Sequence, residues 1–72
     1  MQEKLIILRK TNGVSQKEIS NYLGITNATY SLKENGKFQF TANEMFMLSS
    51  FFKLPIEDIF LPTILQNGVK EQ

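Results

Sequence analysis

The stretch GVSQKEISNYLGITNATYSLKENGK, residues 13–37, contains the signals that decide how this chain folds. Ser15 and Glu18 have the spacing of a capping box, in which the serine hydroxyl accepts a hydrogen bond from the glutamate N–H and the glutamate carboxylate accepts one from the serine N–H. Ile19 and Leu23 follow on one face, one turn apart, as the buried side of an amphipathic helix requires. The pattern predicts a short helix that begins directly after the serine.

A second helix is predicted after a glycine turn. Gly24 suits the left-handed end of the first helix, and Thr26 is a candidate N-cap for the next one. That helix runs to Glu34, where an Asn-Gly pair stops it. Two short helices joined by a glycine-containing turn are typical of a helix-turn-helix, here over residues 15–35.

Further helices are predicted on both sides of this unit. Residues 2–11 form the first, a second capping box (Thr41–Glu44) opens one that runs to about Phe52, and Pro55 suits the first position of a short fifth helix. No alternation typical of strands competes with these patterns. We therefore expect an all-α, compact five-helix domain over residues 1–60.

The composition excludes several classes of function. At 72 residues the chain has room for one small domain. It contains no cysteine and no histidine, so we expect no disulfide, no metal and no cofactor. Without these residues or clustered carboxylates, we expect neither an enzyme nor a small-molecule substrate. No apolar run approaches the roughly 18 residues of a membrane span, and a cytoplasmic setting is expected.

The net charge of +1 is unevenly distributed along the chain. Residues 1–40 hold six cations and three anions, whereas residues 41–72 hold two cations and four anions. A mildly basic front half can face phosphate groups, although many DNA-binding domains are far more basic. The charge pattern therefore favours a nucleic-acid partner only weakly.

Residues 5–60 resemble the Cro/C1-type (XRE-like) helix-turn-helix family. The resemblance rests on residues 13–37, with YSLKENGK at 30–37, and on a closing EDIF segment at 57–60. It is strongest toward the short regulators of temperate phages and mobile elements of Gram-positive bacteria. The resemblance implies a DNA-binding regulator in a bacterial host cell, with an internal ion pair between Arg9 and Glu34.

The same resemblance places one face of the second short helix in the DNA major groove. This reading face consists of Asn27, Ala28, Ser31 and Leu32. Asn27 can bond adenine through two hydrogen bonds, whereas Ala28 and Leu32 can touch only thymine methyl groups. We expect the stem of Lys33 to pack on the domain while its amine points outward.

Phosphate contacts are expected around this face. The candidates are Gln16, Lys17, Thr26, Asn35 and Lys37. Backbone N–H groups at the start of a helix favour phosphate, which supports the residues nearest such a start. Since only two of the five are cations, a steep salt dependence of binding is not expected.

Apolar side chains lie in unusual places on the fourth predicted helix. Its core stripe follows helical spacing, and consists of Met45, Leu48, Ser49 and Phe52. Phe46, Met47 and Phe51 lie off that stripe, and Phe38 stands where many relatives of the family carry Arg or Lys. Exposed Met and Phe clusters mark contact surfaces.

Residues 61–72 offer an alternative explanation for these apolar side chains. They are predicted to be a C-terminal tail or a short helical turn that packs on the domain, covering the cluster with Leu61, Ile64 and Leu65. In that arrangement the cluster is internal packing. Otherwise it is a protein interface, for self-association as a homodimer or for another partner.

Two functions remain open from the sequence. The first is a small repressor of Cro type that binds palindromic operator DNA as a dimer. The second is a protein-binding antirepressor, resembling a modulator of repression, that masks the DNA-reading helix of a partner phage-type repressor without binding DNA itself. The uncharged reading face favours the second, and the family resemblance favours the first.

Overall fold

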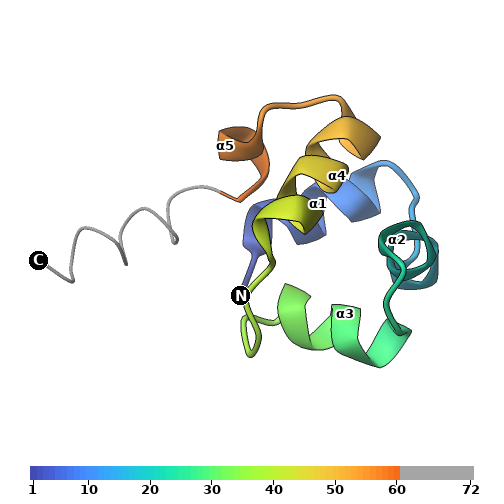
Figure 1. Ribbon diagram of the computed structural model, residues 1–72. Coiled ribbons are helices and arrows are strands. Elements are labelled where there is room, and N and C mark those ends of the chain that lie inside the picture. Colours follow the sequence, from blue (N-terminus) through green and yellow to red (C-terminus); the bar gives the residue numbers. More distant parts are fainter. Residues whose placement is uncertain (61–72) are drawn as a thin grey trace, which may run out of the picture.

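The computed structural model describes residues 1–60, and within them the chain is an all-α bundle (Figure 1). In chain order the helices are α1 (Glu3–Thr11), α2 (Gln16–Leu23), α3 (Asn27–Glu34), α4 (Ala42–Phe52) and α5 (Ile56–Ile59). The described residues contain no strand. The five-helix all-α class expected from the sequence is thereby confirmed.

Local capping interactions place the helix boundaries where the sequence predicts them. Ser15 and Glu18 form both hydrogen bonds of a capping box at α2, and Thr41 and Glu44 do the same at α4. Thr26 caps α3 by accepting a hydrogen bond from the Thr29 N–H. Because these hydrogen bonds join residues three apart, short sequence patterns are sufficient to locate them.

The start of α5 differs from the expectation. Pro55 is the N-cap of α5 with an extended backbone (φ −62°, ψ 152°), and not the first helical residue. Proline restricts the residue before it to extended backbone and fixes its own φ, so both positions suit it. The α4 helix ends at Phe52 as expected, and its C-cap Lys53 has the left-handed conformation (φ 57°), which is uncommon for a residue with a side chain.

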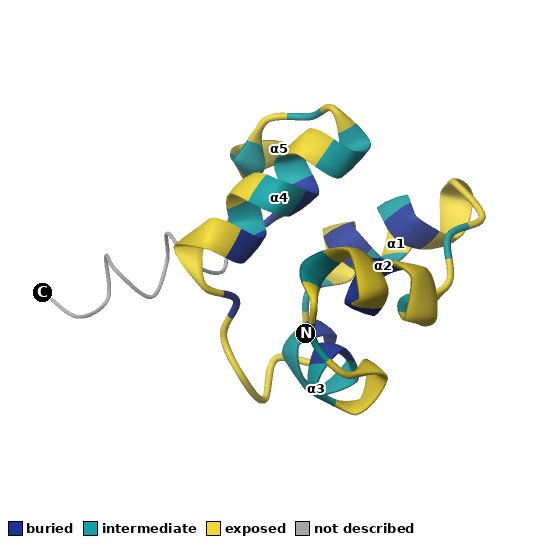
Figure 2. Cartoon of the chain, turned by 45° about the vertical axis from the view of Figure 1, so that its right-hand side comes forward, coloured by how far each residue is buried: buried dark blue, intermediate teal, exposed yellow. Residues whose placement is uncertain are grey.

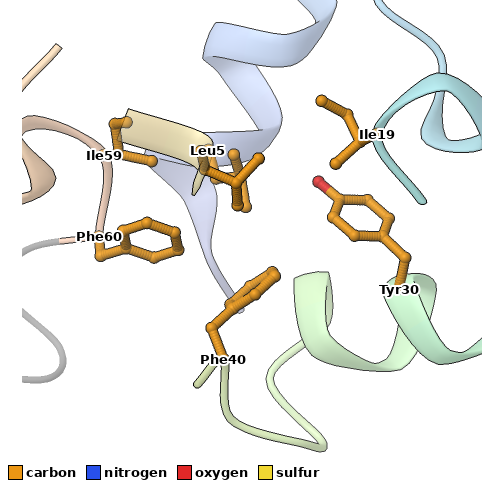
Figure 3. Close-up of a cluster of buried hydrophobic side chains, with 7 residues drawn as sticks. Leu5, Ile19, Tyr30, Phe40, Ile59 and Phe60 are labelled. Carbon is orange, nitrogen blue, oxygen red and sulfur yellow. The ribbon is translucent and has the colours of Figure 1, made fainter. Parts of the chain in front are cut away.

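The helices pack as two groups around a shared core. α2 packs on α3, and α5 packs on both α1 and α4. Every helix and the α3–α4 loop contribute side chains to the buried core: Leu5, Ile19, Tyr30, Phe40, Leu48, Ile59 and Phe60. Six of these are labelled in Figure 3, where the Tyr30 ring rises from α3 toward Ile19 of α2.

Phe40 joins the two halves of this core although it belongs to no helix. Its ring meets that of Tyr30 edge-on at 6.0 Å between ring centres, and that of Phe60 at 5.2 Å. Edge-to-face aromatic pairs at such distances stabilise a core beyond simple burial. The loop between α3 and α4 is thereby held at its C-terminal end, which positions the exposed residues before it.

The predicted packing of residues 61–72 on the domain, through Leu61, Ile64 and Leu65, lies outside the described residues. Among residues 1–60, no helix has the length and apolar character needed to cross a membrane.

Candidate nucleic-acid interface

A buried polar cluster joins α1, α2 and α3 behind the reading face. Arg9 donates from Nε to Glu34 Oε2 at 2.8 Å and from Nη2 to Oε1 at 3.3 Å. Its Nη1 donates to the Val14 carbonyl at 2.9 Å, which holds the α1–α2 turn. The structure therefore contains the Arg9–Glu34 ion pair that the family resemblance implies.

Two further side chains complete the cluster around the Glu34 carboxylate. Gln16 Nε2 donates to Oε1 and the Tyr30 hydroxyl donates to Oε2, each at 2.8 Å. Burial alone would raise the pKa of Glu34, but the hydrogen bonds from Arg9, Gln16 and Tyr30 outweigh it and hold the pKa below its ordinary value. Burial and the neighbouring carboxylate raise the pKa of Tyr30. The carboxylate stays charged and fixes how α3 sits on α1 and α2.

The structure corrects the expectation that the Lys33 amine points outward. The amine donates instead to both oxygens of Glu44 at 2.6 and 2.8 Å. The two side chains are 11% and 10% exposed. The turn after α3 brings the end of this helix against the start of α4, so the amine reaches the capping carboxylate instead of solvent. Lys33 thus braces α3 against α4 and is not available to a partner.

The outward face of α3 carries the predicted reading residues. Asn27 and Ala28 are exposed on the first turn, and Ser31 and Leu32 are half-buried one turn later. Figure 2 shows the change from the exposed start of α3 to its more buried end. Residues four apart on a helix lie one above the other, so the four side chains form one continuous face.

The predicted phosphate contacts differ in how many of their polar groups already have partners within the protein. Lys17, Asn35 and Lys37 are exposed. Gln16 donates one amide N–H to Glu34, so its second N–H can donate to an outside acceptor. The Thr26 hydroxyl is bonded to that of Thr29 at 2.9 Å as part of the α3 cap, so its role in the described structure is local.

The amino terminus packs against the end of α3. The Gln2 N–H donates to the Glu34 carbonyl at 2.9 Å. A Cβ added at Gly36, whose φ is +85°, would lie 2.8 Å from the Met1 nitrogen. Both the left-handed backbone and this close approach require glycine. The contact gives the carboxyl end of α3 a second support beside the buried cluster.

The four apolar residues predicted as a possible protein interface differ from one another in their surroundings. Phe38 and Phe46 are exposed, at 54% and 64%. Met47 is half-buried, and its sulfur lies 3.7 Å from the Asn43 amide nitrogen. These three remain candidates for a contact surface on the α3–α4 loop and α4.

Phe51, the fourth residue of that set, has neighbours within the domain. Its ring is half-buried, packs on the core, and lies 4.9 Å from the rings of both Tyr22 and Phe52. Its position on α4 turns it toward the end of α2. That neighbour is not visible from the α4 sequence, because it depends on how the two helices are arranged in space.

Sequence reasoning missed several functional contacts of the site. It did not identify the Lys33–Glu44 ion pair or the hydrogen bonds from Gln16 and Tyr30 to Glu34. The Tyr30–Glu34 pair has four-residue spacing, which is the one signal that a sequence pattern offers. The Gln16–Glu34 and Lys33–Glu44 contacts join different helices, so no local pattern indicates them.

The fold and this interface define a helix-turn-helix DNA-binding domain, and comparison with known proteins agrees. The helix-turn-helix family model matches residues 5–59. The chain is 31% identical over 61 residues to an uncharacterized HTH-type transcriptional regulator of Methanocaldococcus jannaschii, and the match covers 85% of this chain and 92% of that protein. No solved structure matches significantly. The chain belongs to the Cro/C1-type helix-turn-helix family, a class of DNA-binding transcriptional regulators.

Proposed function

We propose that this protein is a small repressor of Cro type in a phage-type genetic switch, acting in the cytoplasm of a bacterial host. It binds palindromic operator DNA as a dimer, with one α3 in the major groove of each half-site. The observation that carries this proposal is the outward α3 face, rigidly held by the buried cluster behind it. A recognition helix must be fixed in this way to read base edges.

Each part of the interface has a separate task in this mechanism. Asn27 supplies the side-chain amide that can bond adenine through two hydrogen bonds. The backbone N–H groups at the start of α2, next to Lys17, meet one phosphate. Lys37 and Asn35, after the end of α3, meet the backbone on the other side of the groove. Phosphate contacts orient the helix, and the base contacts select the site.

A gel-shift titration tests the proposal. The DNA is the intergenic region beside the gene for this protein, and each binding reaction contains this protein, a phage-type repressor that binds the same region, or both. We expect a specific shift with this protein alone. Asn27→Ala should weaken that binding by about 1–3 kcal/mol, since it removes a two-bond base contact. Asn21→Ala is the matched control, because Asn21 is an exposed asparagine on α2 outside the reading face.

A second function is favoured by one observation. The reading face presents no charge, and the exposed Phe38 and Phe46 lie on the adjoining loop and α4. Such a surface suits an antirepressor that covers the DNA-reading helix of a partner repressor. In that case this protein alone shifts no DNA, but it abolishes the shift by the partner. Leu32→Lys would then reduce capture of the partner in a pull-down, and equal capture would contradict this alternative.

A further inference from the structure

Four of the six polar side chains of α3 are bonded inside the protein. Lys33 is bound to Glu44, and Glu34 is bound within the buried cluster. Tyr30 donates to Glu34, and the Thr29 hydroxyl bonds that of Thr26. Within residues 27–34, both charged side chains are thereby neutralised by internal partners. A helix that meets DNA with this face does so without a charge of its own.

The remaining outward groups are few and mostly small or apolar. Asn27 and Ser31 offer one amide and one hydroxyl, and Ala28 and Leu32 offer hydrocarbon. Ala28 and Leu32 are four residues apart, so they lie along one line on the helix surface. Ala28 is exposed and Leu32 is half-buried. Half of the face can therefore make only apolar contacts with its target.

We infer that α3 selects its operator through thymine methyl groups, contacted by Ala28 and Leu32, beside an adenine bonded by Asn27. This inference rests on the proposed DNA-binding function and specifies the DNA that the site takes. Among the four bases, thymine alone presents a methyl group in the major groove. A charged face would favour guanine through Arg or Lys, and α3 has no such group available. The operator half-sites are thus A·T-rich where α3 lies.

The spacing of the two apolar residues limits where these thymines stand. Four residues of α-helix rise about 6 Å, at roughly 1.5 Å per residue. Base pairs follow one another at about 3.4 Å. Ala28 and Leu32 therefore span about two base steps when α3 lies along the groove. We expect each half-site to contain two thymines within about that distance of one another.

The experiment begins with a site chosen by the protein itself. The full chain selects binding duplexes from random double-stranded DNA, and the enriched site is then synthesised with each thymine replaced singly by deoxyuridine. This change removes one methyl group and leaves base pairing intact. At two positions per half-site we expect about fourfold weaker binding, because burial of one methyl group is worth about 0.8 kcal/mol and 1.4 kcal/mol is tenfold.

A protein variant assigns one of these methyl groups to its contact. Leu32→Ser should abolish the deoxyuridine effect at one position and leave it intact at the other, since the effects of two contacting groups do not add. Ile7→Ser is the matched control, because Ile7 is an exposed apolar residue of α1, at 64% exposure. It should change neither the affinity nor the deoxyuridine effect. Circular dichroism of both variants establishes that they are folded.

The possible results separate this inference from the proposed function. If no duplex is enriched, the DNA-binding function itself is wrong, and the methyl contacts with it. If a duplex is enriched but binds equally well with deoxyuridine at every position, DNA binding stands and the methyl inference is overturned. A deoxyuridine effect that Leu32→Ser leaves unchanged, together with one that Ala28→Ser leaves unchanged, overturns the assignment to these two residues.

Discussion

Glu34 is the residue on which the geometry of the interface depends most. Its carboxylate accepts hydrogen bonds from Arg9, Gln16 and Tyr30, which come from α1, α2 and α3. A buried carboxylate with this many donors keeps its charge, and the hydrogen bonds from Arg9 and Gln16 hold α1 and α2 against α3. Gln16 is also the first residue of α2, at the end proposed to face phosphate. The cluster and the phosphate contact therefore share one side chain.

Replacement of Arg9 tests the importance of this cluster for stability. Arg9→Met should lower the free energy of unfolding by about 3–5 kcal/mol, because it leaves the buried Glu34 charge without its main partner. Urea denaturation followed by circular dichroism measures the change. Lys10→Met is the control, since Lys10 is exposed and surface changes are usually within about 0.5 kcal/mol. A loss below about 1 kcal/mol for Arg9→Met would contradict the role given to the pair.

At the scale of elements, α3 is held at both ends. Its start is capped by Thr26 and packs on α2. At its end, Lys33 bonds Glu44 of α4, and the amino terminus lies against Gly36. Glu44 has two roles, because its carboxylate accepts from Lys33 and also from the Thr41 N–H in the α4 capping box. The loop that carries Lys37 and Phe38 is therefore anchored by contacts on either side of it.

The end of α4 contains a local strain that can be relieved. Lys53 has φ 57°, and a left-handed backbone costs a residue with a Cβ roughly 1 kcal/mol or more. Lys53→Gly should therefore raise the free energy of unfolding by about 0.5–1 kcal/mol, after the greater freedom of glycine in the unfolded chain is included. Thermal unfolding measures it. Lys53→Ala removes the same charge but keeps the strain, so it should show no gain, and an equal gain would point to charge instead.

For the whole molecule, stability should decline at both acid and alkaline pH. The pKa values of Glu34 and Glu44 are lowered in the folded protein, since burial opposes their charge but the hydrogen bonds to it prevail. Their stabilisation is present above the unfolded value of about 4.5 and is lost as the pH falls through the folded pKa. The pKa of Tyr30 is raised, so its contribution is present below its unfolded value of 10.0 and is lost as the pH rises above it.

Urea midpoints between pH 3 and pH 11 would trace this curve, and about pH 5 to 9 should be its plateau. Glu34→Gln should flatten the acid limb, whereas Tyr30→Phe should flatten the alkaline limb because it removes the titrating hydroxyl. If Tyr30→Phe loses stability above pH 10 as steeply as the unchanged protein, another group is responsible for the alkaline limb.

The helix boundaries and the helix-turn-helix could be read from the sequence because their causes are local. The capping boxes at Ser15 and Thr41 join residues three apart, and Gly24 ends α2 through its own backbone freedom. Helical periodicity puts Asn27, Ala28, Ser31 and Leu32 on one side of α3, and the family resemblance implies that this side faces DNA. The same periodicity places Tyr30 on the inward side, where the structure has it buried.

The sequence by itself therefore determined the all-α class, the capped starts of α2, α3 and α4, and which residues share one side of α3. Tertiary structure alone decided which polar groups are left to meet a partner. Lys33 reaches Glu44, and Phe51 meets Tyr22, only because separate helices cross at particular angles. Such contacts join residues 11 and more positions apart, and no short pattern in the chain encodes the packing that brings them together.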